Sequence, residues 1–123
     1  GIVYGHFNPA RYNVKIGGIT MQTATYSVTL ESTMGPKFGT LRLERHDASL
    51  CGVFTILGTA NRFCGGSCSA HTCLFPCTLQ TEMGPVECQI FLMEDRGVLH
   101  GTAKTNRGSM EITGLLCPDA PAD

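Results

Sequence analysis

Apolar and polar residues alternate along most of the chain from Tyr26 onward, and a period of two is typical of half-buried β-strands. In the first such segment, Tyr26, Val28 and Leu30 are separated by single polar residues. Similar short segments follow, divided by turns rich in Gly, Pro, Asp and Asn. Helical spacing of apolar residues is absent from any stretch of useful length. The pattern therefore predicts an all-β protein.

An internal repeat organises these segments. The tripeptide Met34-Gly35-Pro36 returns as Met83-Gly84-Pro85, an offset of 49 residues. At this offset, nine of the 37 positions from 29 to 65 are identical without a gap, whereas average residue usage would give roughly two or three. We interpret the chain as a tandem duplication, with repeat 1 at residues 24–66 and repeat 2 at residues 73–115.

Each repeat contains four predicted strands. The residues expected to face inward in repeat 1 are Tyr26, Val28, Leu30, Leu41, Leu43, Leu50, Gly52, Phe54, Ile56, Asn61, Phe63 and Gly65. Residues 45–48 and 94–97 are polar and are expected to form turns. Eight short strands with tight connections favour an antiparallel up-and-down barrel, since closure removes the edges. A two-sheet sandwich uses the same inward residues and is the alternative.

The predicted organisation is one domain over residues 1–123. Residues 1–13 match neither repeat and are expected to form an irregular N-terminal arm, with residues 14–25 leading into the first strand. Residues 116–123 have the composition of a flexible tail or linker, including Pro118 and Pro121. The chain begins with Gly1 rather than Met. Together these features suggest a module of a longer protein.

Charge excludes several function classes. Nine Lys and Arg against ten Asp and Glu give a formal net charge of -1, and 15% of the residues are charged. A nucleic-acid-binding protein needs a basic excess on one face, and a membrane-surface protein needs a polybasic segment. No apolar run is long enough to span a membrane, and no secretory signal is visible, so we predict a cytoplasmic protein.

The two repeats differ in bulk at matched inward positions, which suggests space for a ligand. Phe54 corresponds to Ala103, and Ile56 corresponds to Thr105. Protein cores rarely leave voids, so the N-terminal arm, a partner chain or a small apolar molecule is expected to fill the interior. A fully packed core is the alternative. The candidate ligand-binding residues are Tyr26, Phe54, Phe63, Phe75, Leu99 and Ala103.

Seven cysteines are unusual in a chain of 123 residues, and four of them lie with a histidine between positions 64 and 77. The weak metal-ligand candidates are Cys64, Cys68, His71, Cys73 and Cys77. If the segment turns at Ala70-His71, Cys64 faces Cys77 and Cys68 faces Cys73. These pairs would lie about 13 Å apart, too far for one zinc ion.

The repeat places Cys77 inward and Cys64 outward, so a bulge at Gly65-Gly66 is needed to let them face each other. Otherwise their symmetric spacing is accidental. The spacing favours free thiols over one or two disulfides and over a metal or redox role, because Cys51, Cys88 and Cys117 are isolated in sequence.

Three hypotheses of function follow. The first is a non-catalytic barrel module that binds a small apolar or aromatic molecule, or a neighbouring domain. The second is an assembly module, including a homo-oligomer, that uses Phe91, Val53 and Leu57 on its outer face. The third and weakest is a thiol-dependent or metal site around Cys64–Cys77. We predict no catalytic residue and no cofactor.

Overall fold

The computed structural model describes residues 11–16 and 19–118, with side chains from Met21 onward. These residues form nine strands and no helix, so none of them belongs to a helix able to cross a membrane. The strands are β1 (Arg11–Ile16), β2 (Ile19–Ser32), β3 (Gly35–His46), β4 (Ser49–Ile56), β5 (Thr59–Cys68), β6 (Thr72–Thr81), β7 (Gly84–Asp95), β8 (Val98–Thr105) and β9 (Gly108–Leu116).

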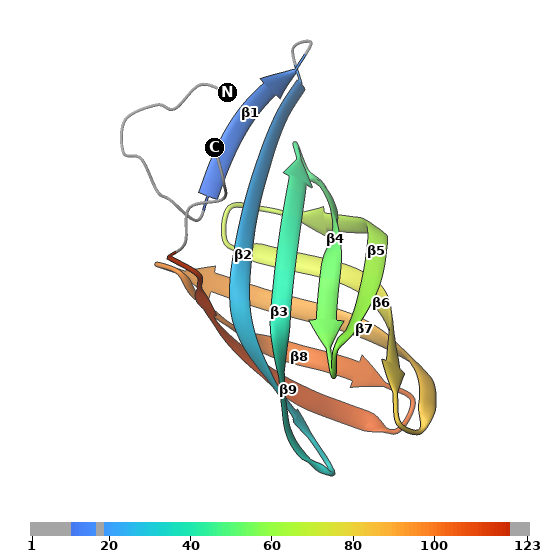
Figure 1. Cartoon of the computed structure of the whole chain (residues 1–123). Helices are drawn as coiled ribbons and strands as arrows, with labels where there is room; N and C mark the ends of the chain where they lie inside the picture. Colours follow the sequence, from blue (N-terminus) through green and yellow to red (C-terminus); the bar gives the residue numbers. More distant parts are fainter. Residues whose placement is uncertain (1–10, 17–18, 119–123) are drawn as a thin grey trace.

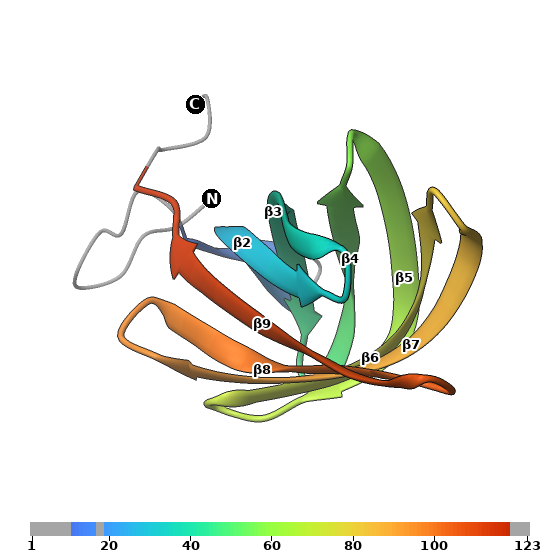
Figure 2. The same ribbon diagram turned by 90° about the horizontal axis from the view of Figure 1, so that it is seen from below.

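Strands β2 to β9 form a closed antiparallel barrel (Figures 1 and 2). Each strand pairs with its neighbour in sequence, and β2 pairs with β9 from Tyr26↔Leu116 to Glu31↔Glu111. The prediction of an eight-stranded up-and-down barrel is confirmed, and the sandwich alternative is wrong. Closure through β2 and β9 pairs the two strands that would be the edges of an open eight-stranded sheet.

Strand β1 is the part of the described structure that the repeat does not predict. It pairs with the first half of β2, from Arg11↔Ala24 to Ile16↔Ile19. Residues 11–13, expected in an irregular arm, are therefore part of a strand. The sequence carried a signal for this hairpin, because apolar residues alternate on both sides of a Gly-Gly pair. The tail predicted from residue 116 begins too early, because Leu116 ends β9 and the backbone N–H of Cys117 donates to the carbonyl of Thr25 at 2.9 Å. Residues 1–10 of the expected arm and residues 119–123 of the tail lie outside the described residues.

The strand boundaries of the two halves are related by the same offset as the sequence. Strand β7 begins and ends 49 residues after β3, and β8 begins and ends 49 residues after β4. The turns also match, since Ser32 and Thr81 each donate a side-chain hydrogen bond to the carbonyl of the glycine three residues later. A common origin by duplication stays a prediction.

The barrel interior is built from the residues that alternation assigned inward. The buried apolar residues are Ala24, Tyr26, Val28, Leu30, Leu41, Leu43, Leu50, Phe54, Ile56, Phe63, Cys73, Phe75, Cys77, Leu79, Cys88, Ile90, Leu92, Leu99, Ala103 and Ile112. At Gly101, an added Cβ would lie 1.9 Å from the carbonyl oxygen of Phe91. Glycine is needed there because the backbone of the neighbouring strand β7 lies too close to leave room for a side chain.

A β-bulge interrupts the pairing of β4 with β5. Leu50 pairs with Gly66 and Gly52 pairs with Phe63, so one residue, Cys51, lies opposite two. Gly65, with φ of 76°, is one of those two, as expected where a bulge needs a left-handed residue. The other is Cys64, which forms a disulfide with Cys51 across a Cα–Cα distance of 4.0 Å.

Strands β5 and β6 share the shortest ladder of the barrel, and we call this junction the β5–β6 seam. Within the described residues they pair at two positions, Ser67↔Leu74 and Cys68↔Cys73. Farther along, the rings of Phe63 and Phe75 stack with centroids 4.0 Å apart. Over the rest of the seam, side-chain contacts stand in place of ladder pairs.

Asn61 links β5 to β6 at the end of the β5–β6 seam that lies farthest from the β5–β6 turn. Its amide nitrogen donates to the carbonyls of Phe54 at 3.0 Å and Thr59 at 3.1 Å. Its Oδ1 accepts a hydrogen bond from the backbone N–H of Gln80 on β6, at 3.0 Å. Asn61 is 5% exposed, so this one side chain connects β4, β5 and β6 from inside the barrel.

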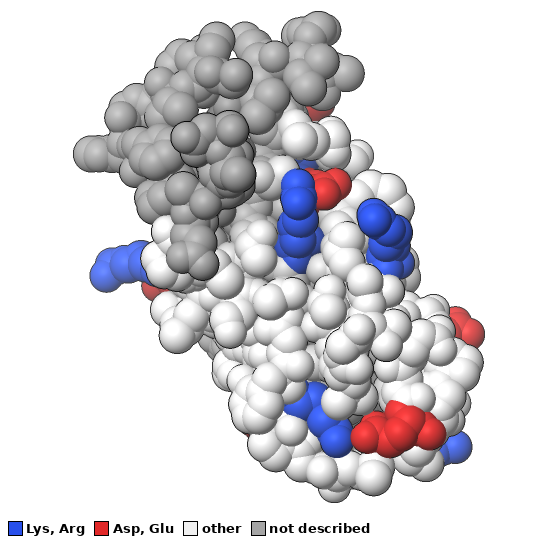
Figure 3. All heavy atoms as spheres, in the orientation of Figure 1, with Lys and Arg blue, Asp and Glu red and all other residues white. Residues whose placement is uncertain are grey.

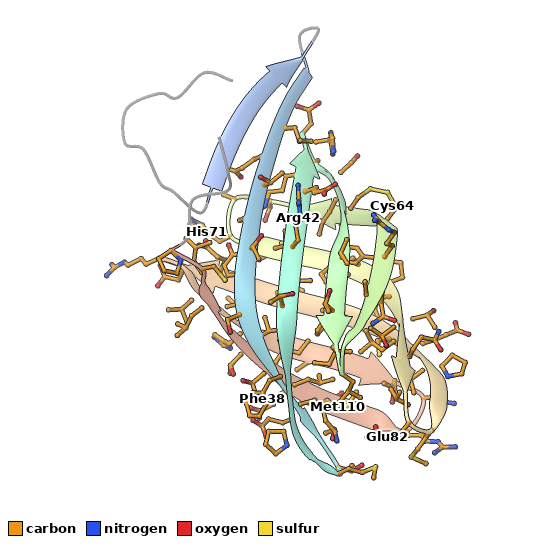
Figure 4. The ribbon with its side chains drawn as sticks, in the orientation of Figure 1. Phe38, Arg42, Cys64, His71, Glu82 and Met110 are labelled. Carbon is orange, nitrogen blue, oxygen red and sulfur yellow. A yellow bond between two sulfur atoms is a disulfide. The ribbon has the colours of Figure 1, made fainter. Side chains whose placement is uncertain are left out.

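The two ends of the barrel differ in chemistry. One end carries the β2–β3, β4–β5, β6–β7 and β8–β9 turns, and there Lys37 Nζ and Glu82 Oε2 lie 3.3 Å apart. The opposite end, which we call the mouth, carries the β3–β4, β5–β6 and β7–β8 turns, including His71 (Figure 4). On the visible face, charged side chains are few and separated by uncharged surface (Figure 3). No large basic or acidic patch appears on that face.

Candidate functional site

Two inward charged residues occupy equivalent places at the mouth. Alternation continues past Leu43 to Arg45 on β3, and past Leu92 to Glu94 on β7. Arg45 is half-buried and Glu94 is 7% exposed. The prediction that both residues lie in turns is wrong, because β3 runs to His46 and β7 runs to Asp95. A charged pair at matched inward positions, 49 residues apart, was the signal that could have identified them.

Glu94 is held from the β5–β6 and β7–β8 turns. Its Oε2 accepts a hydrogen bond from the backbone N–H of Gly97 at 3.0 Å. Its Oε1 lies 3.9 Å from Nδ1 of His71, and its backbone N–H donates to the carbonyl of His71 at 2.8 Å. A buried carboxylate requires such partners, since an isolated charge in a protein interior is strongly unfavourable. The position of the carboxylate is therefore fixed.

Arg45 reaches across the mouth to the β5–β6 turn. Its Nη1 donates to the carbonyl of Ser69 at 2.9 Å, and its Nη2 donates to Sγ of Cys73 at 3.4 Å. Burial raises the pKa of the Cys73 thiol, and the Arg45 guanidinium partly offsets that rise. The guanidinium has five N–H donors, of which these contacts use two, and the side chain lines the cavities described next.

Two adjoining cavities lie at the mouth, and both are lined by Gln22, Arg45 and Ala70. The outer cavity has a volume of about 400 Å³ and is open to solvent. Its remaining lining residues are Asp47, Ala48, Cys68 and Ser69. The inner cavity, of about 110 Å³, extends down to Tyr26 and Glu94. A molecule in these cavities would lie between a fixed guanidinium and a fixed carboxylate.

The predicted ligand-binding residues are brought together in the barrel interior. All six are buried, with exposed fractions from 0% to 7%. Tyr26 lines the inner cavity of the mouth, and Phe63 and Phe75 stack on each other. They are Tyr26, Phe54, Phe63, Phe75, Leu99 and Ala103. Their contact with a ligand stays a prediction.

The cysteine-rich segment forms the expected hairpin, but its sulfur atoms are not gathered at one point. Cys68 and Cys73 are directly opposed, as predicted, and both are free thiols. The expected pairing of Cys64 with Cys77 is wrong, since Cys64 is joined to Cys51 and Cys77 is opposed to Cys88. Cys64 faces outward, as the repeat predicts, because it follows the inward Phe63 in regular alternation, and it lies beside Cys51 on β4.

Most of the cysteines are thiols, as the spacing indicated. Five are free, and the disulfide at Cys51–Cys64 is the exception. Cys51 was counted among the isolated residues because its partner is distant in sequence and adjacent only in the sheet. Among the described residues, no group of three or more His, Cys, Asp or Glu is placed to hold a metal ion.

The residues predicted to contact a partner are spread over the barrel. Val53 lies on β4, Leu57 lies in the β4–β5 turn and Phe91 lies on β7. The structure instead places two other exposed apolar residues beside Phe91. Leu74 is directly opposed to it on β6, and Met93 is the next outward residue on β7.

Comparisons with protein-family models, with curated proteins and with solved structures give no match to this chain. The function is therefore inferred from the residues of the mouth alone.

Proposed function

We propose that this protein is a non-catalytic β-barrel binding module that holds a small ligand at its mouth. The observation that carries the proposal is the pair of inward charges, Arg45 and Glu94, lining one inner cavity. Both side chains point inward at the end of the barrel, where Arg45 is half-buried and Glu94 is 7% exposed. Here the fold directs both of them into a concave site.

The chemistry of the mouth favours a zwitterionic molecule of about the size of an amino acid. A guanidinium binds a carboxylate through two parallel hydrogen bonds, and a carboxylate accepts from an ammonium group. Gln22 supplies both a donor and an acceptor between them. Ala48 and Ala70 provide small apolar surfaces in the outer cavity. The polar inner cavity thus changes the expected ligand from an apolar molecule to a charged one.

The test measures the thermal unfolding and calorimetric binding of the chain with a panel of free amino acids. Each amino acid is matched by its N-acetyl amide, which lacks both charges. A ligand at 100 times its dissociation constant stabilises the folded state by about 2.7 kcal/mol. We expect at least one free amino acid to bind and its amide to fail.

The variant Arg45→Gln is expected to lose binding at least tenfold. Its matched control is Arg42→Gln, because Arg42 lies on the same strand but faces outward, where its Nε is 3.2 Å from Glu44 Oε2. Equal binding by both variants, or no binding of any amino acid by the unaltered chain, would refute the proposal. Preferred binding of an apolar aromatic compound would restore the interior-pocket hypothesis instead.

A second candidate function, assembly with another protein, is favoured by a difference between the two halves. In the first half, the outward positions on β3 hold the ion pair of Arg42 and Glu44. The matching positions on β7 hold Phe91 and Met93, which are 41% and 47% exposed. Exposed apolar side chains clustered on one face are typical of interaction sites.

The double variant Phe91→Arg/Met93→Glu copies the first-half pair onto the second half and tests this candidate. Sedimentation velocity at high protein concentration measures the outcome. We expect association in the unaltered chain and a monomer in the variant. A monomeric unaltered chain would remove the homo-oligomeric form of this hypothesis. The cytoplasmic location stays a prediction, and the Cys51–Cys64 disulfide is of a kind more common in oxidising compartments.

A further inference from the structure

Six of the seven cysteines lie in three cross-strand pairs on consecutive strands. Cys51 on β4 lies beside Cys64 on β5, and the two form the disulfide. Cys68 on β5 is directly opposed to Cys73 on β6. Cys77 on β6 is directly opposed to Cys88 on β7. Scattered structural thiols would not be expected to face one another on each successive strand pair.

We propose that Cys68 and Cys73 are a second disulfide site, oxidised by exchange with a small-molecule disulfide such as oxidised glutathione. Directly opposed residues of an antiparallel pair have Cα atoms about 4.5–5.5 Å apart. Disulfides span Cα distances of about 4.4–6.8 Å. The bond can therefore form without a change of register in the hairpin.

The two sulfur atoms are suited to different steps of the exchange. Cys68 is half-buried and lines the outer cavity of the mouth, so an external disulfide can reach it. Cys73 is buried and receives the Arg45 hydrogen bond at 3.4 Å. The thiolate is the attacking species in exchange. Burial raises the pKa of Cys73, and the Arg45 guanidinium partly offsets that rise, so Cys73 is suited to the second, intramolecular step, where Sγ of Cys68 lies on the opposed residue.

The reaction is balanced by the glutathione disulfide. Cys68 loses its proton, and its thiolate attacks one sulfur of oxidised glutathione, which releases one glutathione thiolate and leaves a mixed disulfide on Cys68. The Cys73 thiolate then attacks Sγ of Cys68 and releases the second glutathione. Two protein thiols are oxidised, one glutathione disulfide is reduced to two thiols, and the two protons pass to the released glutathione thiolates.

Cys77 and Cys88 provide a control within the same protein. They are opposed in the same way, but both are 4% exposed, and burial raises the pKa of Cys77 to about 11. Neither side chain lines the cavities of the mouth described above. An external disulfide has no route to either sulfur in the folded barrel, so this pair stays reduced.

A disulfide between Cys68 and Cys73 would link β5 and β6 covalently at the β5–β6 seam. This pair is one of two ladder positions that hold the seam, and the other is its neighbour Ser67↔Leu74. A covalent bond there supplements the backbone hydrogen bonds where the sheet has fewest of them. The side of the outer cavity that Cys68 lines would thereby become more rigid.

The experiment uses the full chain with Cys117→Ser, which leaves four of the five free thiols. The folded protein is incubated with oxidised glutathione, quenched in acid, unfolded and alkylated, and the alkyl groups are counted by intact mass. We expect four to fall to two, with no glutathione attached. Four remaining thiols, or a stable glutathione adduct, would overturn the proposal.

Two further variants in this background identify the pair. With Cys73→Ser, the exchange should stop at its first step and leave one glutathione attached to Cys68. With Cys77→Ser and Cys88→Ser together, the two remaining thiols should both disappear, as they do in the parent. If both thiols persist in that variant, the oxidised pair in the parent is not Cys68 and Cys73, and the assignment is refuted. The far-ultraviolet circular dichroism of each variant shows that the barrel is retained.

Discussion

Replacement of Asn61 by alanine tests whether a side chain can substitute for a missing backbone ladder. Asn61 makes three hydrogen bonds, two to carbonyls on its own side of the β5–β6 seam and one from Gln80 across it. A net hydrogen bond contributes about 0.5–1.5 kcal/mol, and a buried group left without a partner costs about 1–3 kcal/mol. The bond to Phe54 is buried, and the other two are partly buried. Asn61→Ala should therefore destabilise the fold by about 2–4 kcal/mol.

Urea unfolding followed by circular dichroism measures this change. With an m-value of about 2 kcal/mol/M, the midpoint should fall by about 1–2 M. Asn106→Ala is the matched control, because Asn106 is exposed in the β8–β9 turn and its loss should shift the midpoint by less than about 0.3 M. A shift for Asn61→Ala as small as that of the control would refute the bridging role.

Three other predictions follow from the described contacts. Gly101→Ala should destabilise the barrel by about 1–3 kcal/mol in the same urea assay, since its Cβ would lie 1.9 Å from the Phe91 carbonyl oxygen, and an unchanged midpoint would contradict the close crossing. Lys37→Ala should change stability by less than about 0.5 kcal/mol, because its ion pair with Glu82 lies at the surface, and a larger loss would show that the pair fastens the turns. Burial raises the pKa of Cys77 from 9.0 to about 11, so the folded state keeps the proton longer than the unfolded state. The associated stability is fully present below pH 9 and lost as pH rises toward 11, and Cys77→Ala should flatten the slope of unfolding free energy over that range.

The barrel could be predicted because period-two alternation specifies both strands and faces. A closed sheet buries one face of every strand, so Tyr26, Phe54 and Ile112 are all inside, where alternation placed them. The turns were predicted too long, since Arg45 and Glu94 were judged by their polarity and not by their place in the alternation. Polar residues at the end of a strand are found at the mouth of a barrel as well as in loops, so polarity alone does not distinguish the two.

The cysteine pairing could not be obtained in full from the sequence. A symmetric spacing revealed Cys68 and Cys73 because they belong to one hairpin. Cys51 and Cys64 continue the register that runs from Ile56↔Thr59 to Gly52↔Phe63, and the bulge begins beyond them. Their pairing therefore depends on the exact position of the β4–β5 turn at Leu57-Gly58, which local sequence pattern specifies poorly. The cavities of the mouth likewise depend on how far the turns lean inward, which no local pattern specifies.

The two junctions between the halves differ in the length of their ladders, and this difference has a consequence for cleavage of the chain by a protease. The β2–β9 junction has six paired positions, whereas the β5–β6 seam has two among the described residues. Cleavage between Ala70 and His71 would therefore leave one fragment with β1 to β5 and one with β6 to β9, which still share the longer β2–β9 ladder. The barrel is thus suited to reassembly from two fragments, and a disulfide at Cys68–Cys73 would keep those fragments attached after cleavage.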